Sequence, residues 1–197
     1  MKLKKIELTL CLVLIGCIFY NFISFANCCN QIKKDVLRLH ILANSDAPSD
    51  QALKLKVRDA VLREGGAIFE GVETINQAKK KASENLDVIR NIAIKELRAN
   101  NCFDSVEVKL SKAFFDTRYY SDFTLPAGEY EALQVIIGEG NGHNWWCVMF
   151  PQMCLAASGK QTRVQTLNEA EQKLVFSNPQ IEIRFKCVEI YEKFIKK

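Results

Sequence analysis

Two short stretches of the sequence hold the residue types that could do chemistry. The first runs from His40 to Asp46 and includes Asn44 and Ser45. Histidine, serine and aspartate are the residue types of a hydrolytic triad, in which the histidine takes the serine proton and the carboxylate orients the histidine. The stretch follows an apolar run and precedes a helical pattern, a place where α/β folds present side chains to ligands. The structural alternative is that Asn44, Ser45 or Asp46 caps the helix and that His40 is half-buried.

The second stretch runs from Gly138 to Cys147 and ends in the sequence His-Asn-Trp-Trp-Cys. Its glycines predict a long hairpin connection rather than a phosphate loop, because phosphate loops open a helix. In a strand, Trp145 and Trp146 would point to opposite faces, so one indole is expected to face outward as a contact for a protein partner. The alternative is that both indoles are buried. His143 with Cys147 would be another nucleophile–base pair.

Charge and composition argue against several classes of protein. The net charge is +4, of which +2 belongs to the first 26 residues, so the remaining chain is close to neutral. It therefore lacks the strong excess of basic residues that is typical of nucleic-acid-binding proteins. The chain has two histidines and no Cys-x-x-Cys pair, which argues against a zinc site. The sequence therefore predicts neither a metal nor another cofactor.

Hydrophobic periodicity predicts the elements that position the two stretches. The predicted strands cover residues 36–42, 106–110, 130–137, 145–150 and 181–185, and the predicted helices cover residues 49–63, 75–99 and 167–176. Residues 187–195 either continue the last strand or form a closing helix, and residues 159–163 are a polar loop. This order predicts an α/β fold over residues 30–197, in which a single-domain mixed sheet packs against two or more helices.

The first 26 residues have the order of an export signal. A basic end at residues 1–5 precedes an apolar run from Leu8 to Phe19, and small residues stand at Ser24 and Ala26. Cleavage after Ala26 is the favoured interpretation. The run is also long enough for an uncleaved membrane anchor, and Leu-Ile-Gly before Cys17 fits a lipidation pattern. All three alternatives deliver the chain from about residue 30 across a membrane.

Six of the eight cysteines follow the export segment, and in an exported protein such a set permits disulfides. Cys147 and Cys154 flank a six-residue segment and are the candidate pair, provided that their Cα atoms lie within about 7 Å. The alternative is that Cys147 is a buried apolar residue beside Trp146.

Longer motifs are more specific than composition. One extends from Leu37 to Asp46 and continues as Asp-Gln-Ala-Leu-Lys-Leu-Lys-Val-Arg-Asp from Asp50; the other extends from Leu125 through Gly138 to Pro151 and includes Trp145-Trp146. Together they strongly resemble the stage II sporulation protein R family of endospore-forming Firmicutes, over roughly residues 35–155.

The resemblance implies a signalling function rather than an enzymatic one. Members of the family are made in the forespore and exported into the space between the forespore and mother-cell membranes. There they trigger a membrane-embedded aspartic protease, the sporulation sigma-E factor processing peptidase, so that the sigma-E precursor is processed. For that partner the candidate contact residues are those of both stretches: His40, Asn44, Ser45, Asp46, His143, Asn144, Trp145 and Trp146. An extracytoplasmic hydrolase that uses His40 or His143 with Ser45, Asp46 or Cys147 is the alternative.

Overall fold

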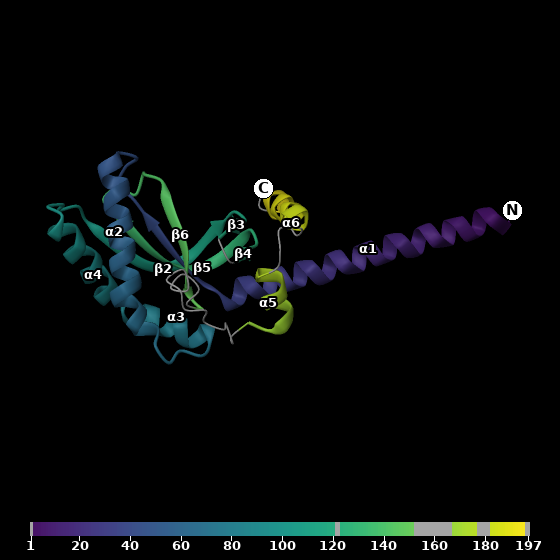
Figure 1. Cartoon of the computed structure of the whole chain (residues 1–197), viewed down its shortest axis with the longest axis horizontal. Helices are drawn as coiled ribbons and strands as arrows, with labels where there is room; N and C mark the ends of the chain where they lie inside the picture. Colours follow the sequence, from purple (N-terminus) through teal and green to yellow (C-terminus); the bar gives the residue numbers. More distant parts are fainter. Residues whose placement is uncertain (1, 121–122, 152–166, 177–181, 196–197) are drawn as a thin grey trace.

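A four-stranded mixed sheet forms the centre of the protein in a computed structural model that describes residues 2–120, 123–151, 167–176 and 182–195 (Figure 1). The inner strands β1 (Leu37–Leu42) and β5 (Gly128–Ile137) run parallel. Strand β2 (Val106–Phe115) pairs antiparallel with β5, and β6 (Asn144–Phe150) pairs antiparallel with β1. The strand order is therefore β2-β5-β1-β6, which confirms the predicted mixed sheet.

Three helices cover one face of the sheet: α2 (Pro48–Gly65), α3 (Ile75–Glu84) and α4 (Leu86–Ala99). A short 3-10 helix, η1 (Gly66–Phe69), joins α2 to the segment before α3. Alternate strand residues point into this layer because side chains of a strand alternate between its faces. They meet the apolar stripes of the helices in one buried cluster, which includes Leu39, Val57, Ile89, Leu133 and Val135.

The opposite face carries the second core. It is covered by the last part of α1 (Lys2–Asp35), by α5 (Glu169–Val175) and α6 (Glu182–Ile195), and by a two-stranded ribbon of β3 (Arg118–Tyr119) and β4 (Thr124–Leu125). Its buried side chains come from distant parts of the chain, among them Phe25, Phe115, Tyr130, Val148 and Phe185. The sheet is therefore the middle layer of three.

Helix α1 has two halves with different surroundings. Its segment from Leu8 is long and apolar enough to cross a membrane, and side chains as far as Ile23 are exposed. Beyond that point, Phe25, Cys29 and Ile32 are at most 8% exposed and belong to the second core. The helix runs without a break past both expected boundaries, the end of the export segment at residue 26 and the start of the domain at residue 30.

Two predicted elements are corrected. The helix predicted over residues 75–99 is two helices, because Asn85 leaves the helical conformation at φ −120° and ψ 19°. The strand predicted over residues 181–185 is wrong, since residues from Glu182 onward form α6. The alternation of apolar residues there matched a strand, but the buried positions Phe185, Val188 and Glu189 follow helical spacing, and Phe185 packs on Phe25 of α1. The polar loop predicted at residues 159–163 lies outside the described residues.

Candidate functional site

The two stretches with reactive residue types meet at one end of the sheet. Because β1 and β5 are parallel neighbours, the loops that follow them, residues 43–47 and 138–143, leave the sheet at the same edge. We call these two loops the loop tip. Backbone bonds join them directly: the Gly142 N–H donates to the Ala43 carbonyl at 2.9 Å, and the Asn141 N–H donates to the Asn44 carbonyl at 3.1 Å.

Glycines make the close approach of these loops possible. Gly138 has φ +57° and faces the side chain of Asn44, which accepts a hydrogen bond from the Glu139 N–H at 3.0 Å. At Gly142 a Cβ atom would collide with the backbone carbonyl of Ser45. These two positions need glycine for different reasons, the first for its left-handed backbone and the second for space.

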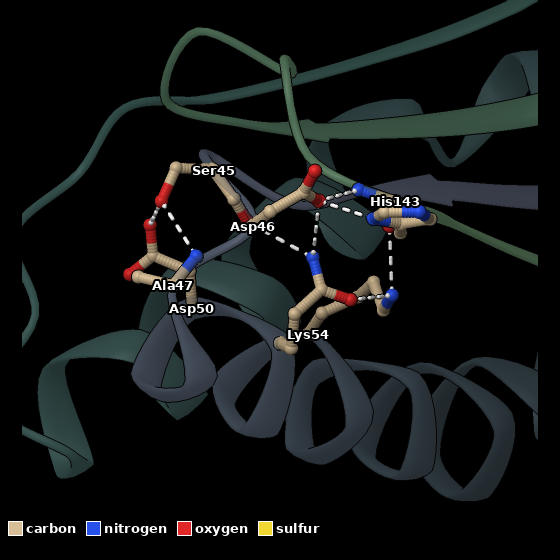
Figure 2. A network of polar contacts seen from close by, with 7 residues as sticks. Ser45, Asp46, Ala47, Asp50, Lys54 and His143 are labelled. Atoms are coloured by element: carbon tan, nitrogen blue, oxygen red, sulfur yellow. Dashed lines mark hydrogen bonds and ion pairs between the residues drawn. The ribbon is translucent and has the colours of Figure 1, made fainter.

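A polar network fixes His143 on the loop tip (Figure 2). One carboxylate oxygen of Asp46 accepts the His143 backbone N–H at 2.6 Å and lies 2.5 Å from His143 Nδ1. Below it, the buried Lys54 of α2 donates to the His143 carbonyl at 2.7 Å and to the Gln51 side chain at 2.5 Å. The hydrogen bonds from the His143 side chain and backbone lower the pKa of Asp46, which keeps this acceptor ionised.

A second carboxylate braces the first loop against α2. Asp50 accepts the Ser45 hydroxyl at 2.7 Å and the Asn44 side-chain amide at 3.1 Å, and these bonds lower the pKa of Asp50. The expected side-chain cap is absent: Ala47 is the N-cap of α2 and makes no side-chain cap bond. Ser45 instead accepts the Ala47 N–H at 3.1 Å, so these polar residues stabilise the loop rather than the helix end.

His40 lies on the other face of the sheet, away from this network. Its ring stacks on Trp146 with 4.6 Å between centroids and meets the edge of Phe115 at 5.8 Å. It is 7% exposed, its Nδ1 lies 3.4 Å from the Gln134 amide, and its Nε2 has no hydrogen-bond partner. Burial lowers the pKa of His40, and the nearby Arg38 charge adds to the effect. His40 and the polar residues 44–46 of the loop that follows its strand thus lie in separate surroundings.

The described residues do not assemble a hydrolytic triad. His143 does lie against the carboxylate of Asp46, but the Ser45 hydroxyl is donated to Asp50. Cys147 is disulfide-bonded and so is no free thiol nucleophile. Its predicted partner, Cys154, lies outside the described residues, and their pairing stays a prediction. Among the described residues, no three His, Cys, Asp or Glu side chains are placed to hold a metal ion.

The two tryptophans point to opposite faces, as predicted, but neither stands free in solvent. Trp145 is half-buried against the helical layer, with the Arg58 guanidinium 4.4 Å from its ring centre. Trp146 is half-buried on the second core, with the Arg118 guanidinium 4.8 Å from its ring. A guanidinium over an indole face is a favourable contact, so each cation covers part of a ring.

Two cations near the site were not among the residues predicted from the sequence. Lys54 reaches the loop tip from α2, and its position three residues after Gln51 could have indicated this. Arg38 is fully buried inside β1, where Nε donates to the Cys147 carbonyl at 2.9 Å and Nη2 donates to the Tyr120 hydroxyl at 2.8 Å. Burial lowers the pKa of Arg38, and the rings of Phe115 and Tyr130 lie against the guanidinium.

Comparison with known proteins places this geometry in a family. The sequence profile of stage II sporulation protein R matches residues 33–160. The chain belongs to the stage II sporulation protein R family. The matched residues cover the whole sheet and the loop tip, so the site described above is part of what the family profile recognises.

A curated relative in the family is the stage II sporulation protein R of Bacillus subtilis (strain 168). It is 37% identical over 144 residues, which are 72% of this chain and 64% of the relative. The match thus spans less than two thirds of the relative's length. No solved structure matches the chain. As a family member with a long apolar N-terminal helix, the chain has a segment consistent with export or anchoring.

Proposed function

We propose that the chain is an exported signal that activates a membrane-embedded aspartic protease, the sigma-E factor processing peptidase, so that the sigma-E precursor is processed. Membership of the stage II sporulation protein R family carries this proposal. The apolar half of α1 supports it, because a signal between compartments has to cross a membrane. In this proposal the chain is made in the forespore and acts in the intermembrane space.

The loop tip is the proposed contact surface for the protease. Asp46, His143 and Asn144 are exposed there, and the partly exposed ring of Trp145 lies next to them in β6. Figure 1 shows these loops on the side of the domain away from the free end of α1. A surface so placed stays accessible while α1 sits in, or has just left, the membrane. His40 and Trp146 stack on each other on the other face of the sheet.

Activation by binding requires no chemistry from the chain itself. The tip has to bind the active state of the protease more tightly than the inactive state, and this difference in affinity sets how far the equilibrium moves. A braced tip suits that task, because a surface already held in its bound shape loses little conformational entropy on binding. The bonds of Asp46, Asp50 and Lys54 described above supply the bracing.

The test is a reconstitution of the full chain with the protease in vesicles, scored by cleavage of the sigma-E precursor. His143→Ala, Asn144→Ala and Trp145→Ala should each reduce activation about tenfold or more, the size expected for an interface anchor. Lys80→Ala on the exposed surface of α3 is the matched control and should activate normally. Full activation by all three tip variants would remove the tip from the proposal.

The His143–Asp46 contact is the one observation that favours the hydrolase alternative. A chain that activates by binding should need an amount comparable with that of the protease, whereas a hydrolase should act in trace amounts. The double variant His40→Gln, His143→Gln, at a concentration that saturates the assay, decides between them. Activation that survives in this variant excludes histidine-based catalysis, and turnover by trace wild-type chain that the variant lacks would establish it.

A further inference from the structure

Three side chains with unused hydrogen-bond donors gather around two aromatic rings on the second-core face of the sheet. The rings of Phe115 and Trp146 meet edge to face, with 4.6 Å between their centroids. The Arg38 guanidinium lies 4.2 Å from the centre of the Phe115 ring. His40 and Arg118 lie against Trp146, at 4.6 Å and 4.8 Å from the centre of its ring. We call Arg38, His40 and Arg118, together with these two rings, the donor cluster.

Each of the three side chains has a buried nitrogen without a hydrogen-bond partner in the part of the chain that the structure describes. These nitrogens are Arg38 Nη1, His40 Nε2 and Arg118 Nε. The arginine nitrogens can only donate. The neutral His40 ring accepts the side-chain amide of Gln134 at Nδ1, 3.4 Å away, and therefore carries its hydrogen on Nε2. All three unused groups are donors, so an acceptor has to satisfy them.

The donor cluster also holds positive charge that no carboxylate of the described residues balances. Arg38 is fully buried, and the ion pairs of the described residues include neither Arg38 nor Arg118. Burial lowers the pKa of Arg38, and the nearby Arg118 charge lowers it further. Removing a guanidinium from water is costly unless a negative group lies against it. The Cys147 carbonyl and the Tyr120 hydroxyl accept hydrogen bonds from Arg38 but bring no opposite charge. An anion would supply both the missing acceptor and the missing charge.

The surroundings of Arg38 favour a carboxylate over a phosphate as that anion. Phosphate sites use the N-terminus of a helix or a turn that presents several backbone N–H groups. Arg38 instead belongs to the inner strand β1, whose backbone pairs with β5 on one side and with β6 on the other. Its unused edge consists of Nη1 and the second hydrogen of Nη2, because Nη2 donates one hydrogen to Tyr120. A flat, singly charged carboxylate matches such an edge with two parallel hydrogen bonds.

Tyr120 separates Arg38 from the partly exposed side of the donor cluster. Its hydroxyl accepts the Arg38 bond at 2.8 Å and donates to the Trp146 carbonyl at 3.2 Å. The side chains of Arg118, Tyr120 and Trp146 are half-buried, so this side of the cluster reaches solvent. A carboxylate that enters there meets Arg118 first, and it reaches Arg38 when the Tyr120 ring turns outward.

We propose that the donor cluster is a binding site for a carboxylate group, which pairs with Arg38 and is also held by Arg118. The site goes beyond the proposed function: it uses no residue of the loop tip and needs no protease, so either proposal can fail without the other. The carboxylate belongs either to a small organic acid or to an acidic side chain of a peptide, and the choice of probe distinguishes these two sources.

Fluorescence of Trp146 reports binding in the full chain in detergent. The chain has two tryptophans, so Trp145→Phe leaves Trp146 as the single one, and this variant is the parent for all measurements. Titration with sodium acetate, and separately with the peptide acetyl-Gly-Glu-Gly-amide, is carried out at an ionic strength kept constant with sodium chloride. Each should give a saturable change in emission, and the probe that saturates at the lower concentration indicates the source. Sodium phosphate at the same ionic strength should give no saturable change.

Substitutions of the arginines locate the binding. Arg118→Gln should raise the half-saturating concentration about tenfold or more, as expected for the loss of a charged hydrogen-bond donor. Arg38→Met should abolish saturation, and Arg118→Gln, at a half-buried position, keeps the test decisive if Arg38→Met does not fold. Arg58→Gln is the matched control: Arg58 lies 4.4 Å from the ring centre of residue 145 in the wild type, on the other face of the sheet, and its loss should leave binding unchanged. The proposal is overturned if neither carboxylate probe saturates, if phosphate saturates at the same concentration, or if Arg118→Gln binds like the parent.

Discussion

At the scale of single residues, the sheet separates two histidines that the sequence places near similar polar neighbours. His143 is exposed on the loop tip and contacts Asp46, whereas His40 is enclosed by Trp146 and Phe115. The Nε2 atom of His40 is buried without a partner. Burial disfavours the protonated form of this imidazole and lowers its pKa, and the neighbouring Arg38 charge acts in the same direction.

His40 therefore makes the stability of the fold depend on pH. Its pKa is lowered in the folded state from the ordinary value of 6.5, so the unfolded chain binds the proton more readily. The stability that neutral His40 contributes is complete above pH 6.5 and is lost as the pH falls toward its folded pKa. In His40→Gln we expect the urea concentration at the unfolding midpoint to change less between pH 6.5 and 4.5 than it does in the wild type. Asn141→Ala is the non-titrating control. An unchanged slope in His40→Gln would contradict this.

At the scale of elements, the loop tip depends on two connections that pack as one unit. The backbone bonds between residues 43–44 and 141–142 leave no room for a side chain at Gly142. Since β1 and β5 carry these loops to the same edge, strand pairing and loop contact reinforce each other. The sequence pattern of glycines predicted a long connection but gave no sign of the loop it would contact.

Gly142→Ala should disrupt that unit. The added Cβ would meet the Ser45 carbonyl and carbon, both backbone atoms, so relief requires the loops to move apart. We expect a loss of about 1–3 kcal/mol in the free energy of unfolding, the usual cost of overpacking, measured by denaturant unfolding of the full chain in detergent. Asn141→Ala, at an exposed neighbour, should change it little. Equal stabilities of the two variants would show that the loops separate freely.

At the scale of the whole molecule, the helix whose first part is long and apolar enough to cross a membrane also completes the second core. Phe25, Cys29 and Ile32 come from α1, yet they pack with residues of β5, α5 and α6. The free end of α1 and the loop tip thus lie at different ends of one continuous structure (Figure 1). Cleavage after Ala26 would remove Phe25 from the core and leave Phe185 uncovered on that side.

The cost of that cleavage can be measured with two truncated chains. A chain that begins at Asn27 lacks Phe25, whereas one that begins at Ser24 keeps it and lacks residues 1–23, none of whose described side chains is buried. We expect the first to be less stable by about 3 kcal/mol, as for the loss of a buried phenylalanine side chain, in chemical denaturation followed by circular dichroism. If both chains unfold at the same denaturant concentration, the α1 contact contributes nothing and the domain begins after residue 26.

The sequence by itself determined the local features of this protein: the apolar first helix, the strands that alternate or are wholly apolar, and the motifs of the family. These depend on periodicity and on residue order, which a sequence displays directly. The tertiary structure alone decided which partners those residues meet. In the folded chain, residues from Glu182 onward form a helix instead of the predicted strand. His40 and His143 lie on separate surfaces, and the Ser45 hydroxyl donates its hydrogen bond to Asp50. Such outcomes depend on contacts between residues far apart in the chain, and a local sequence pattern does not indicate those contacts.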